Sequence, residues 1–304
     1  MKQCQRQQWP NRGLLWGLLV CLWAQLGCSA MRLGSRPDIE LEDPAALGKT
    51  VVTNPLALPG VYSHRVSQYV FNSDFKLRPS QPLFDELSAM RDTIYKELQL
   101  PPANTLIQVY LFESRDRYEK FMQHRYPELP RRRAFFISQP RAVAGSDELL
   151  VYTFWGDHIR QDLRHELTHA LLHAVLRDVP LWLDEGLAEY FELPPSNKGV
   201  NYAHLEKLRR GNPPPNLPRL EQLSQVQQMA PEEYREAWAW VHLMLHSTPA
   251  ARNVLLGYLQ QLRTSNKPGL LAPSLAVVMP SLNEAFREHL LQLERNALPP
   301  PRAW

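Results

Sequence analysis

The scarcest residue in this chain of 304 residues is cysteine. Its three cysteines, Cys4, Cys21 and Cys28, all lie within the first 28 residues, so the remainder of the chain has none. That remainder can form neither a disulfide framework nor a metal site built on thiolates. The whole chain contains 44% hydrophobic and 21% charged residues and is long enough to bury a core of ordinary composition.

The chain also lacks a large excess of either positive or negative residues. The formal net charge is only +3, and the segment 1–27 accounts for all of it, because it carries Lys2, Arg6 and Arg12 and no acidic residue. A body without net charge is poorly suited to a polyanion, so we expect no nucleic-acid partner. Glycine is also scarce, with 13 residues against 27 prolines, which indicates many short elements joined by stiff connections.

Long hydrophobic runs are absent except near the N-terminus, at residues 14–24. A run of about a dozen apolar residues after a basic stretch is too short for a comfortable membrane span and is typical of a signal peptide. We therefore expect a signal peptide at 1–27 and a polar, Pro-containing tether at 28–60.

The signal segment ends in Gly27-Cys28-Ser29, which resembles the bacterial lipobox, where a small residue precedes a cysteine that is lipidated after cleavage. The resemblance implies lipidation of Cys28, attachment to a membrane through this lipid anchor, and a location in the bacterial cell envelope or periplasm. Gln25 stands where that pattern usually has an aliphatic or small residue. Plain cleavage near Ala30 is the alternative.

In the body, the patterns that predict strands come early and those that predict helices come late, which favours an α+β fold. Alternating or β-branched runs predict strands at 66–75, 106–112 and 149–154. Helical spacing of apolar residues predicts helices at 82–98, 114–122, 158–176, 184–192, 231–246, 250–263 and 282–293. Residues 125–147, with the run Arg131-Arg132-Arg133, are expected to form a solvated loop, and a patch for an anionic ligand is the alternative for the three arginines. Residues 213–218 are expected to form a linker.

The helix predicted at 158–176 contains His165-Glu166-Leu167-Thr168-His169, an H-E-x-x-H pattern. Residues four apart lie one turn apart on the same helix face, so both imidazoles can reach one metal ion. Glu166 then lies beside the open coordination position, where it can take a proton from the water that the metal activates. Apolar flanking residues indicate a buried helix rather than a surface helix with two polar histidines. His173 is a further turn along the axis, and we expect it to be structural.

A carboxylate on the following helix should complete the site. The segment Trp182-Leu183-Asp184-Glu185-Gly186-Leu187-Ala188-Glu189-Tyr190, paired with H-E-x-x-H, resembles the gluzincin clan of zinc metallopeptidases, and most closely the peptidase MA-like families of exported bacterial proteins. The resemblance implies Zn²⁺ as cofactor and Glu185 as the third zinc ligand. Glu189, one turn on, is well placed to accept the second N–H of a ligand histidine. Asp184 is expected to face away from Glu185 and to be a solvated acidic residue at the start of the helix.

A looser part of the same resemblance concerns Tyr234, which opens a helix after Pro231. In the clan, a tyrosine in such a segment stabilises the oxyanion of the tetrahedral intermediate, which implies that role for Tyr234. The alternatives are an ordinary buried aromatic residue, or His242 as a substitute donor on the same face. The G-x-M-E-N motif of the clan's aminopeptidases is absent from residues 144–149, so the resemblance does not imply aminopeptidase activity.

These observations predict a zinc-dependent metallopeptidase that acts on a peptide or protein substrate. We expect a zincin-like catalytic domain at 61–200, with a small mixed sheet and helices, a helical part at 201–295 that completes the cleft, and a Pro-rich tail at 296–304. A strand near Leu149–Thr153 is expected to form an edge that pairs with an extended substrate backbone.

Two other classes remain open at this stage. The first is a binding or scaffold lipoprotein that keeps a zincin fold without catalysis, and the intact Glu166 argues against it, because a structural zinc needs no general base. The second is a zinc hydrolase of a non-peptide amide, such as one in the cell wall. The same chemistry cleaves any amide, so the sequence does not separate it from a peptidase.

Overall fold

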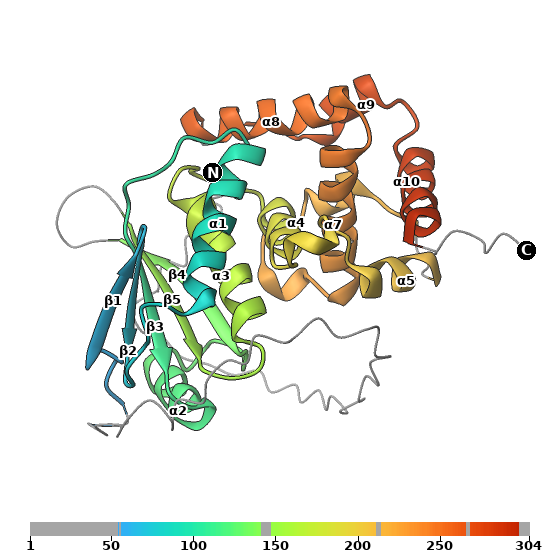
Figure 1. The fold of residues 1–304 in the computed structure, drawn as a ribbon. Coiled ribbons are helices and arrows are strands. Elements are labelled where there is room, and N and C mark those ends of the chain that lie inside the picture. Colours follow the sequence, from blue (N-terminus) through green and yellow to red (C-terminus); the bar gives the residue numbers. More distant parts are fainter. Residues whose placement is uncertain (1–53, 55, 141–146, 211–213, 266–267, 298–304) are drawn as a thin grey trace, which may run out of the picture.

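A five-stranded mixed sheet forms one side of the molecule in the computed structural model (Figure 1). The structure describes residues 54, 56–140, 147–210, 214–265 and 268–297. The predicted signal peptide, Cys28, most of the tether and residues 298–304 of the tail lie outside the described residues. The strand order is β1-β2-β3-β5-β4. The strands are β1 (Tyr62–Val66), β2 (Tyr69–Ser73), β3 (Ile107–Phe112), β4 (Ala134–Gln139) and β5 (Glu148–Phe154).

Parallel pairing in the centre of the sheet joins β2 to β3 and β3 to β5, while β1 and β4 are antiparallel to their neighbours. The predicted strands at 106–112 and 149–154 are confirmed as β3 and β5. The strand predicted at 66–75 is confirmed only over 69–73, as β2, and a second strand, β1, precedes it. Ser67, with φ of 55°, turns the chain there, so β1 and β2 form a hairpin.

The strand β4 corrects two further predictions. Residues 125–147 are not a continuous loop, because 134–139 pair with β5, with Phe136 opposite Val151. The strand near Leu149–Thr153 is not an edge, since β5 lies between β3 and β4. The sequence of β4, Ala134–Gln139, does not alternate between apolar and polar residues as β3 does, and its backbone partners come from a strand later in the chain.

Helices cover both faces of the sheet, because successive side chains of a strand point to opposite faces and both sets are apolar in β5. Leu149 and Val151 of β5 pack in the same hydrophobic cluster as α1 (Pro82–Glu97) and α3 (Ile159–His173). Leu150 and Tyr152 pack on the other face against α2 (Arg115–Arg125), which begins after the capping residue Ser114. These three helices confirm the predictions at 82–98, 114–122 and 158–176, with small shifts at their ends.

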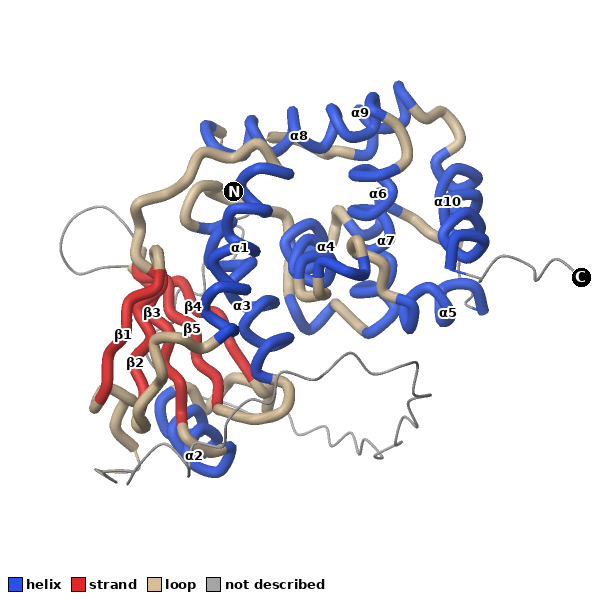
Figure 2. Tube along the Cα trace, viewed as in Figure 1, coloured by secondary structure: helices blue, strands red, loops and turns tan. Residues whose placement is uncertain are grey.

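The remaining helices form the other side of the molecule (Figure 2). They are α4 (Leu181–Phe191), α5 (Tyr202–Arg210), α6 (Leu217–Leu220), α7 (Pro231–His246), α8 (Pro249–Thr264), α9 (Ala272–Val278) and α10 (Leu282–Ala297). α7 is the central helix, since every residue from 236 to 245 is buried. The linker predicted at 213–218 does not reach residue 218, because α6 begins at Leu217 and both Leu217 and Leu220 are fully buried. A helix of four residues is too short to show a period in the sequence.

One continuous hydrophobic cluster joins the two sides. It contains Leu163 and Leu167 of α3, Trp182 of α4, and Trp238 and Trp240 of α7. The architecture is therefore α+β, with strands early and helices late, and the predicted regions 61–200 and 201–295 share a core. Among the described residues, no helix is both long and apolar enough to cross a membrane.

Candidate metal centre

The side chains of His165, His169 and Glu185 meet where α3 crosses α4. The two imidazole Nε2 atoms lie 3.3 Å apart. Glu185 Oε2 lies 3.6 Å from Nε2 of His165 and 3.7 Å from Nε2 of His169. The structure thus brings the three predicted ligands together, with one donor atom of each directed to a common point.

These separations fit a tetrahedral zinc ion. Ligands at about 2.0–2.2 Å from zinc, at tetrahedral angles, lie about 3.3–3.6 Å from one another. Glu185 Oε2 is buried and has no hydrogen-bond partner, and contacts of 3.6 Å and more are too long to be hydrogen bonds. An orphaned carboxylate oxygen facing two imidazole nitrogens is what a bound cation would satisfy. The residues present therefore fit Zn²⁺.

Two features fix the position of α4 beside α3. Gly186 allows close contact with α7, because a Cβ added there would lie 2.7 Å from the backbone oxygen of Ala237. Arg164 of α3 is 5% exposed and donates to the backbone oxygens of Phe191 (2.8 Å), Glu192 (3.0 Å) and Leu193 (2.5 Å). These carbonyls at the C-terminus of α4 would otherwise lack donors. The residue that precedes the H-E-x-x-H pattern thus ties both helices together.

The outer nitrogens of the two imidazoles contact carboxylates. Glu192 lies 2.9 Å from Nδ1 of His165, and Asp184 lies 3.0 Å from Nδ1 of His169. Asp184 also lies 3.0 Å from Nε2 of His173, which gives that histidine a structural role. Such contacts orient a ligand ring and leave its Nε2 free for a metal.

Two predictions are corrected by these contacts. Asp184 is not solvated, because α4 begins beside α3 and its first turn points back to the histidines. The hydrogen bond of Glu189 goes to His204 of α5, at 2.8 Å, rather than to a predicted ligand. Glu192, seven residues after Glu185, lies two turns on along the same face of α4. That spacing was the available signal for its role.

Burial and charge shift the acids and bases of this centre. Burial lowers the pKa of His165 and His169, but Glu185 and Glu192 on the first and Asp184 on the second outweigh it, so both pKa values are raised. Burial raises the pKa of Glu185, yet the two histidines bring it below its ordinary value. For Glu166, burial dominates and its pKa is raised. A glutamate with a raised pKa is better matched to proton transfer near neutral pH.

Tyr234 is held near the same centre by an arginine. Nη2 of Arg132 donates to the hydroxyl of Tyr234 at 3.3 Å. Burial and the charge of Glu185 raise the pKa of Tyr234, so its hydroxyl stays protonated and can donate. Arg133 forms a bidentate contact with Asp162 of α3, at 2.7–3.1 Å. The three arginines are therefore not simply a solvated run, and sequence reasoning missed Arg132.

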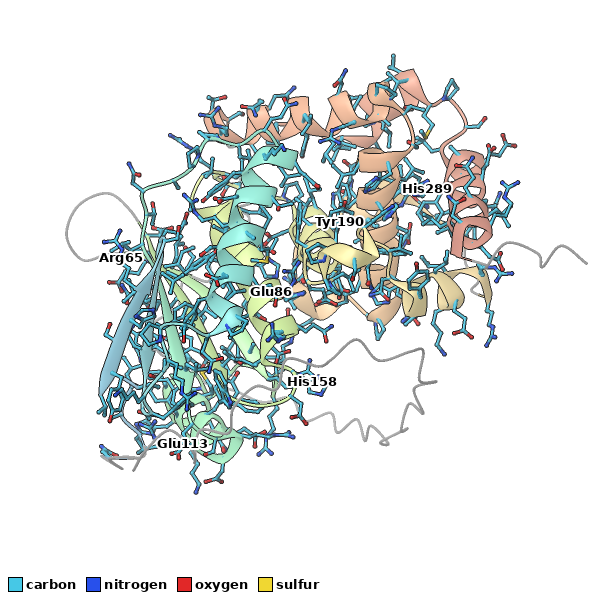
Figure 3. The ribbon with its side chains drawn as sticks, viewed as in Figure 1. Arg65, Glu86, Glu113, His158, Tyr190 and His289 are labelled. Carbon is cyan, nitrogen blue, oxygen red and sulfur yellow. The ribbon has the colours of Figure 1, made fainter. Side chains whose placement is uncertain are left out.

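His242, the alternative donor, lies elsewhere. It is 2% exposed, and its Nδ1 contacts Nε2 of His289 at 2.9 Å in the helical part of the molecule (Figure 3). Its place among α7 and α10 residues leaves Tyr234 as the candidate next to the centre.

Comparison with known proteins identifies no relative: no protein-family model matches the chain, and no curated protein matches it. The geometry of His165, His169 and Glu185 is thus the main basis for a conclusion about function.

Proposed function

We propose that this protein is a zinc-dependent metallopeptidase with a zincin-like fold. The observation that carries the proposal is the convergence of His165 Nε2, His169 Nε2 and the unpartnered Glu185 Oε2 at separations of 3.3–3.7 Å. When bound by these three residues, Zn²⁺ would polarise a substrate carbonyl and lower the pKa of water.

The roles of the surrounding residues follow from their contacts. Glu166 accepts the proton of the attacking water, for which its raised pKa is suited. The Tyr234 hydroxyl donates to the negative charge that develops on the carbonyl oxygen, and Arg132 holds this hydroxyl in place. Asp184 and Glu192 keep the two imidazole rings directed at the metal.

The position of β4 favours a peptide over a non-peptide amide as substrate. Phe136 of β4 packs against the rings of His169 and His173, with centroids 6.1 Å and 5.2 Å apart. Within the described residues, no strand pairs with the other side of β4. An extended peptide can add to this free edge by backbone hydrogen bonds and so pass beside α3. Strand addition is thus proposed at β4 rather than β5.

The signal segment and Cys28 complete the proposal. They favour export to the bacterial cell envelope and attachment to a membrane through lipid, with the catalytic part reaching its peptide or protein substrate from a tether.

The test of catalysis is Glu166→Gln. The substitution keeps the size of the side chain and removes its ability to accept a proton, so the protein should fold and hold zinc while turnover falls by about 10²–10⁴-fold. Zinc content by elemental analysis and digestion of a terminally blocked peptide library, read by mass spectrometry, measure both effects. Glu284→Gln, an exposed residue of α10, is the matched control.

Equal digestion by zinc-loaded wild type and Glu166→Gln would contradict the peptidase. If neither cleaves any peptide while both hold zinc, the scaffold alternative replaces it. Cleavage of cell-wall amides alone would instead favour the non-peptide hydrolase.

A further inference from the structure

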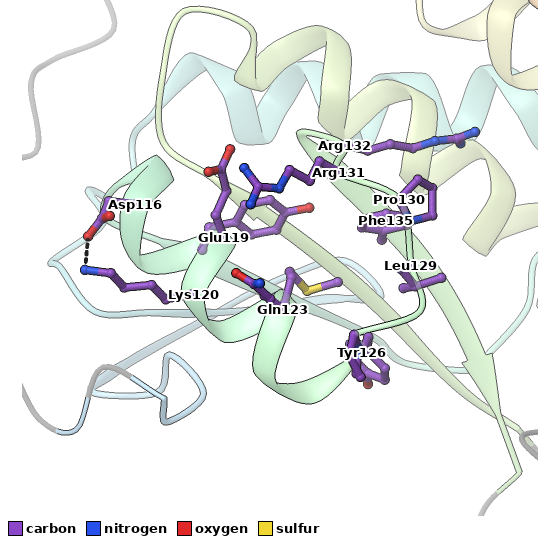
Figure 4. A pocket seen from close by; sticks show the side chains of 13 residues that line it. Asp116, Glu119, Lys120, Gln123, Tyr126, Leu129, Pro130, Arg131, Arg132 and Phe135 are labelled. Carbon is purple, nitrogen blue, oxygen red and sulfur yellow. Dashed lines mark hydrogen bonds and ion pairs between the residues drawn. The ribbon is translucent and has the colours of Figure 1, made fainter. Parts of the chain in front are cut away.

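A cavity of about 330 Å³ lies between α2 and the loop that leads into β4 (Figure 4). Its apolar walls include Met122, Leu129 and Phe135. Tyr118, Arg131 and Arg132 also line it, together with Asp116, Glu119, Lys120 and Gln123. A cavity with both apolar walls and convergent polar groups can hold a ligand that has an apolar part and a charged part.

The charges around this cavity leave a positive excess. Both acids that line it are paired within α2, Asp116 with Lys120 at 2.8 Å and Glu119 with Arg115 at 2.7 Å. Arg131 has no carboxylate within ion-pair distance among the described residues, although it extends on the side of Glu119 (Figure 4).

Arg132 extends in the opposite direction from Arg131 (Figure 4) and donates to the neutral hydroxyl of Tyr234. The charges of Glu185 and Glu166 act on Arg132, so Arg131 is the guanidinium at this cavity that has no acidic partner among the described residues. A carboxylate is a planar anion that such a group binds well.

Tyr118 supplies a second, independent observation. Its side chain is 1% exposed, and its hydroxyl has no hydrogen-bond partner. An unsatisfied buried hydroxyl is unfavourable, so a ligand that accepts a hydrogen bond from it would remove this cost. Burial raises the pKa of Tyr118 far above its ordinary value, which keeps the hydroxyl a donor.

The cavity is also connected to the metal centre. Arg132 both lines the cavity and donates to Tyr234, the proposed oxyanion donor. Tyr118 is close enough to Glu166 for the charge of that glutamate to act on its hydroxyl. Arg131 and Arg132 lie just before β4, so a peptide paired along the free edge of β4 would reach the loop that lines the cavity.

We propose that this cavity binds a carboxylate of the substrate, through Arg131 and the Tyr118 hydroxyl, beside the bond to be cleaved. The carboxylate comes from a Glu or Asp side chain or from the free C-terminus of a peptide. This inference rests on the proposed peptidase function, and it names the class of substrate: peptides with a negative charge close to the scissile bond.

The test measures binding separately from cleavage. Immobilised, zinc-loaded full-length Glu166→Gln protein is mixed with three octapeptide libraries, and the retained peptides are quantified by mass spectrometry. The first library has blocked ends and contains Glu and Asp, the second lacks both but has a free C-terminal carboxylate, and the third has neither. We expect one of the first two to be retained at least about tenfold more than the third.

Arg131→Gln and Tyr118→Phe, each combined with Glu166→Gln, should reduce this preference to less than about threefold. Arg287→Gln, an exposed arginine on α10, is the matched control and should keep it. Circular dichroism and zinc content establish that the variants fold. If a variant fails to fold, 50–500 mM salt applied to the parent protein provides the second measurement, because a charge-based preference must fall with salt.

The outcomes separate the two proposals. A preference for carboxylate peptides that Arg131→Gln abolishes supports the cavity even if wild type cleaves nothing, in which case the peptidase alone is wrong. Retention equal to the third library, or a preference unchanged in Arg131→Gln, overturns the cavity even if wild type cleaves peptides. The library retained identifies the source of the carboxylate.

Discussion

Two carboxylates that are not among the proposed metal ligands contact the imidazoles at the centre and so orient them. Asp184 contacts His169 and His173, and Glu192 contacts His165. The positions of His165, His169 and Glu185 could be predicted from the sequence, because their spacing follows from helix geometry and the resemblance. The contacts of Asp184 and Glu192 with these histidines could not be predicted, because a local pattern does not show which turn of α4 faces α3.

Asp184→Asn should lower zinc affinity by about 10–100-fold, because an amide no longer holds the His169 ring as strongly. Glu189→Gln should change it much less, as Glu189 bonds His204. Glu185→Ala should lower it by several orders of magnitude. Titration with a competing chelator measures all three, and an affinity of Glu189→Gln as low as that of Asp184→Asn would contradict the assignment of the partners.

At the scale of the elements, the position of α4 beside α3 depends on the close contact of α4 with α7. Gly186 is the signal of that contact in the sequence. Gly186 costs a helix about 1 kcal/mol relative to alanine, which is acceptable only where a side chain has no room. The helices themselves could be predicted because their apolar residues follow a clear period. β4, α6 and the free edge of the sheet could not, because short segments gain their structure from distant partners.

Gly186→Ala should destabilise the protein by about 1–3 kcal/mol, as over-packing does, and weaken zinc binding through the neighbouring Glu185. Gly257→Ala in α8 is the matched control, since nothing lies within 4 Å of the added Cβ. It should stabilise by up to about 1 kcal/mol through helix propensity. Urea unfolding followed by circular dichroism measures both. A Gly186→Ala protein as stable as wild type would show that α4 can move away from α7 freely.

On the scale of the whole molecule, a buried histidine pair attaches the last helix to the central one. His242 of α7 and His289 of α10 are in contact at 2.9 Å. Burial and the neighbouring histidines lower the pKa of His242 to about 3 and that of His289 to about 4. Both are therefore neutral in the folded protein at pH values where the unfolded chain is already protonated.

The pair should make stability depend on pH in a known direction. Because the folded pKa values lie below the unfolded value of about 6.5, the unfolded chain binds more protons between pH 6.5 and about 4, and stability falls as pH falls through this window. Each of the two histidines contributes a loss of about 2–3 kcal/mol between pH 7 and pH 4.5. His289→Gln should lose less stability than wild type when the pH falls. The metal-centre histidines contribute equally to both proteins, so they do not affect the difference between them. Urea unfolding at pH 7 and pH 4.5 measures it. An equal loss of stability in wild type and His289→Gln between pH 7 and pH 4.5 would contradict a contribution of this histidine pair to the pH dependence.

Cys28→Ser tests how the whole molecule is attached. If Cys28 carries lipid, the substitution should move the protein from the membrane to the soluble fraction and leave the signal segment uncleaved at that position. Fractionation with immunoblotting and the mass of the N-terminal peptide provide the readout. Identical, soluble behaviour of both proteins would leave plain cleavage near Ala30 as the explanation.

The shared hydrophobic cluster also bears on how this chain can be divided. α4 supplies Glu185 from a helix whose opposite side is covered by α7, so the two helices that carry the proposed metal ligands share one hydrophobic core with the C-terminal helices. A fragment that ends at residue 200 would expose the Gly186 face of α4 and the ring of Trp182, and we expect it to aggregate rather than bind zinc. Proteolytic cleavage between α4 and α7 should therefore inactivate the protein irreversibly. For the same reason, the part that ends at residue 200 should not fold when it is transferred to another protein.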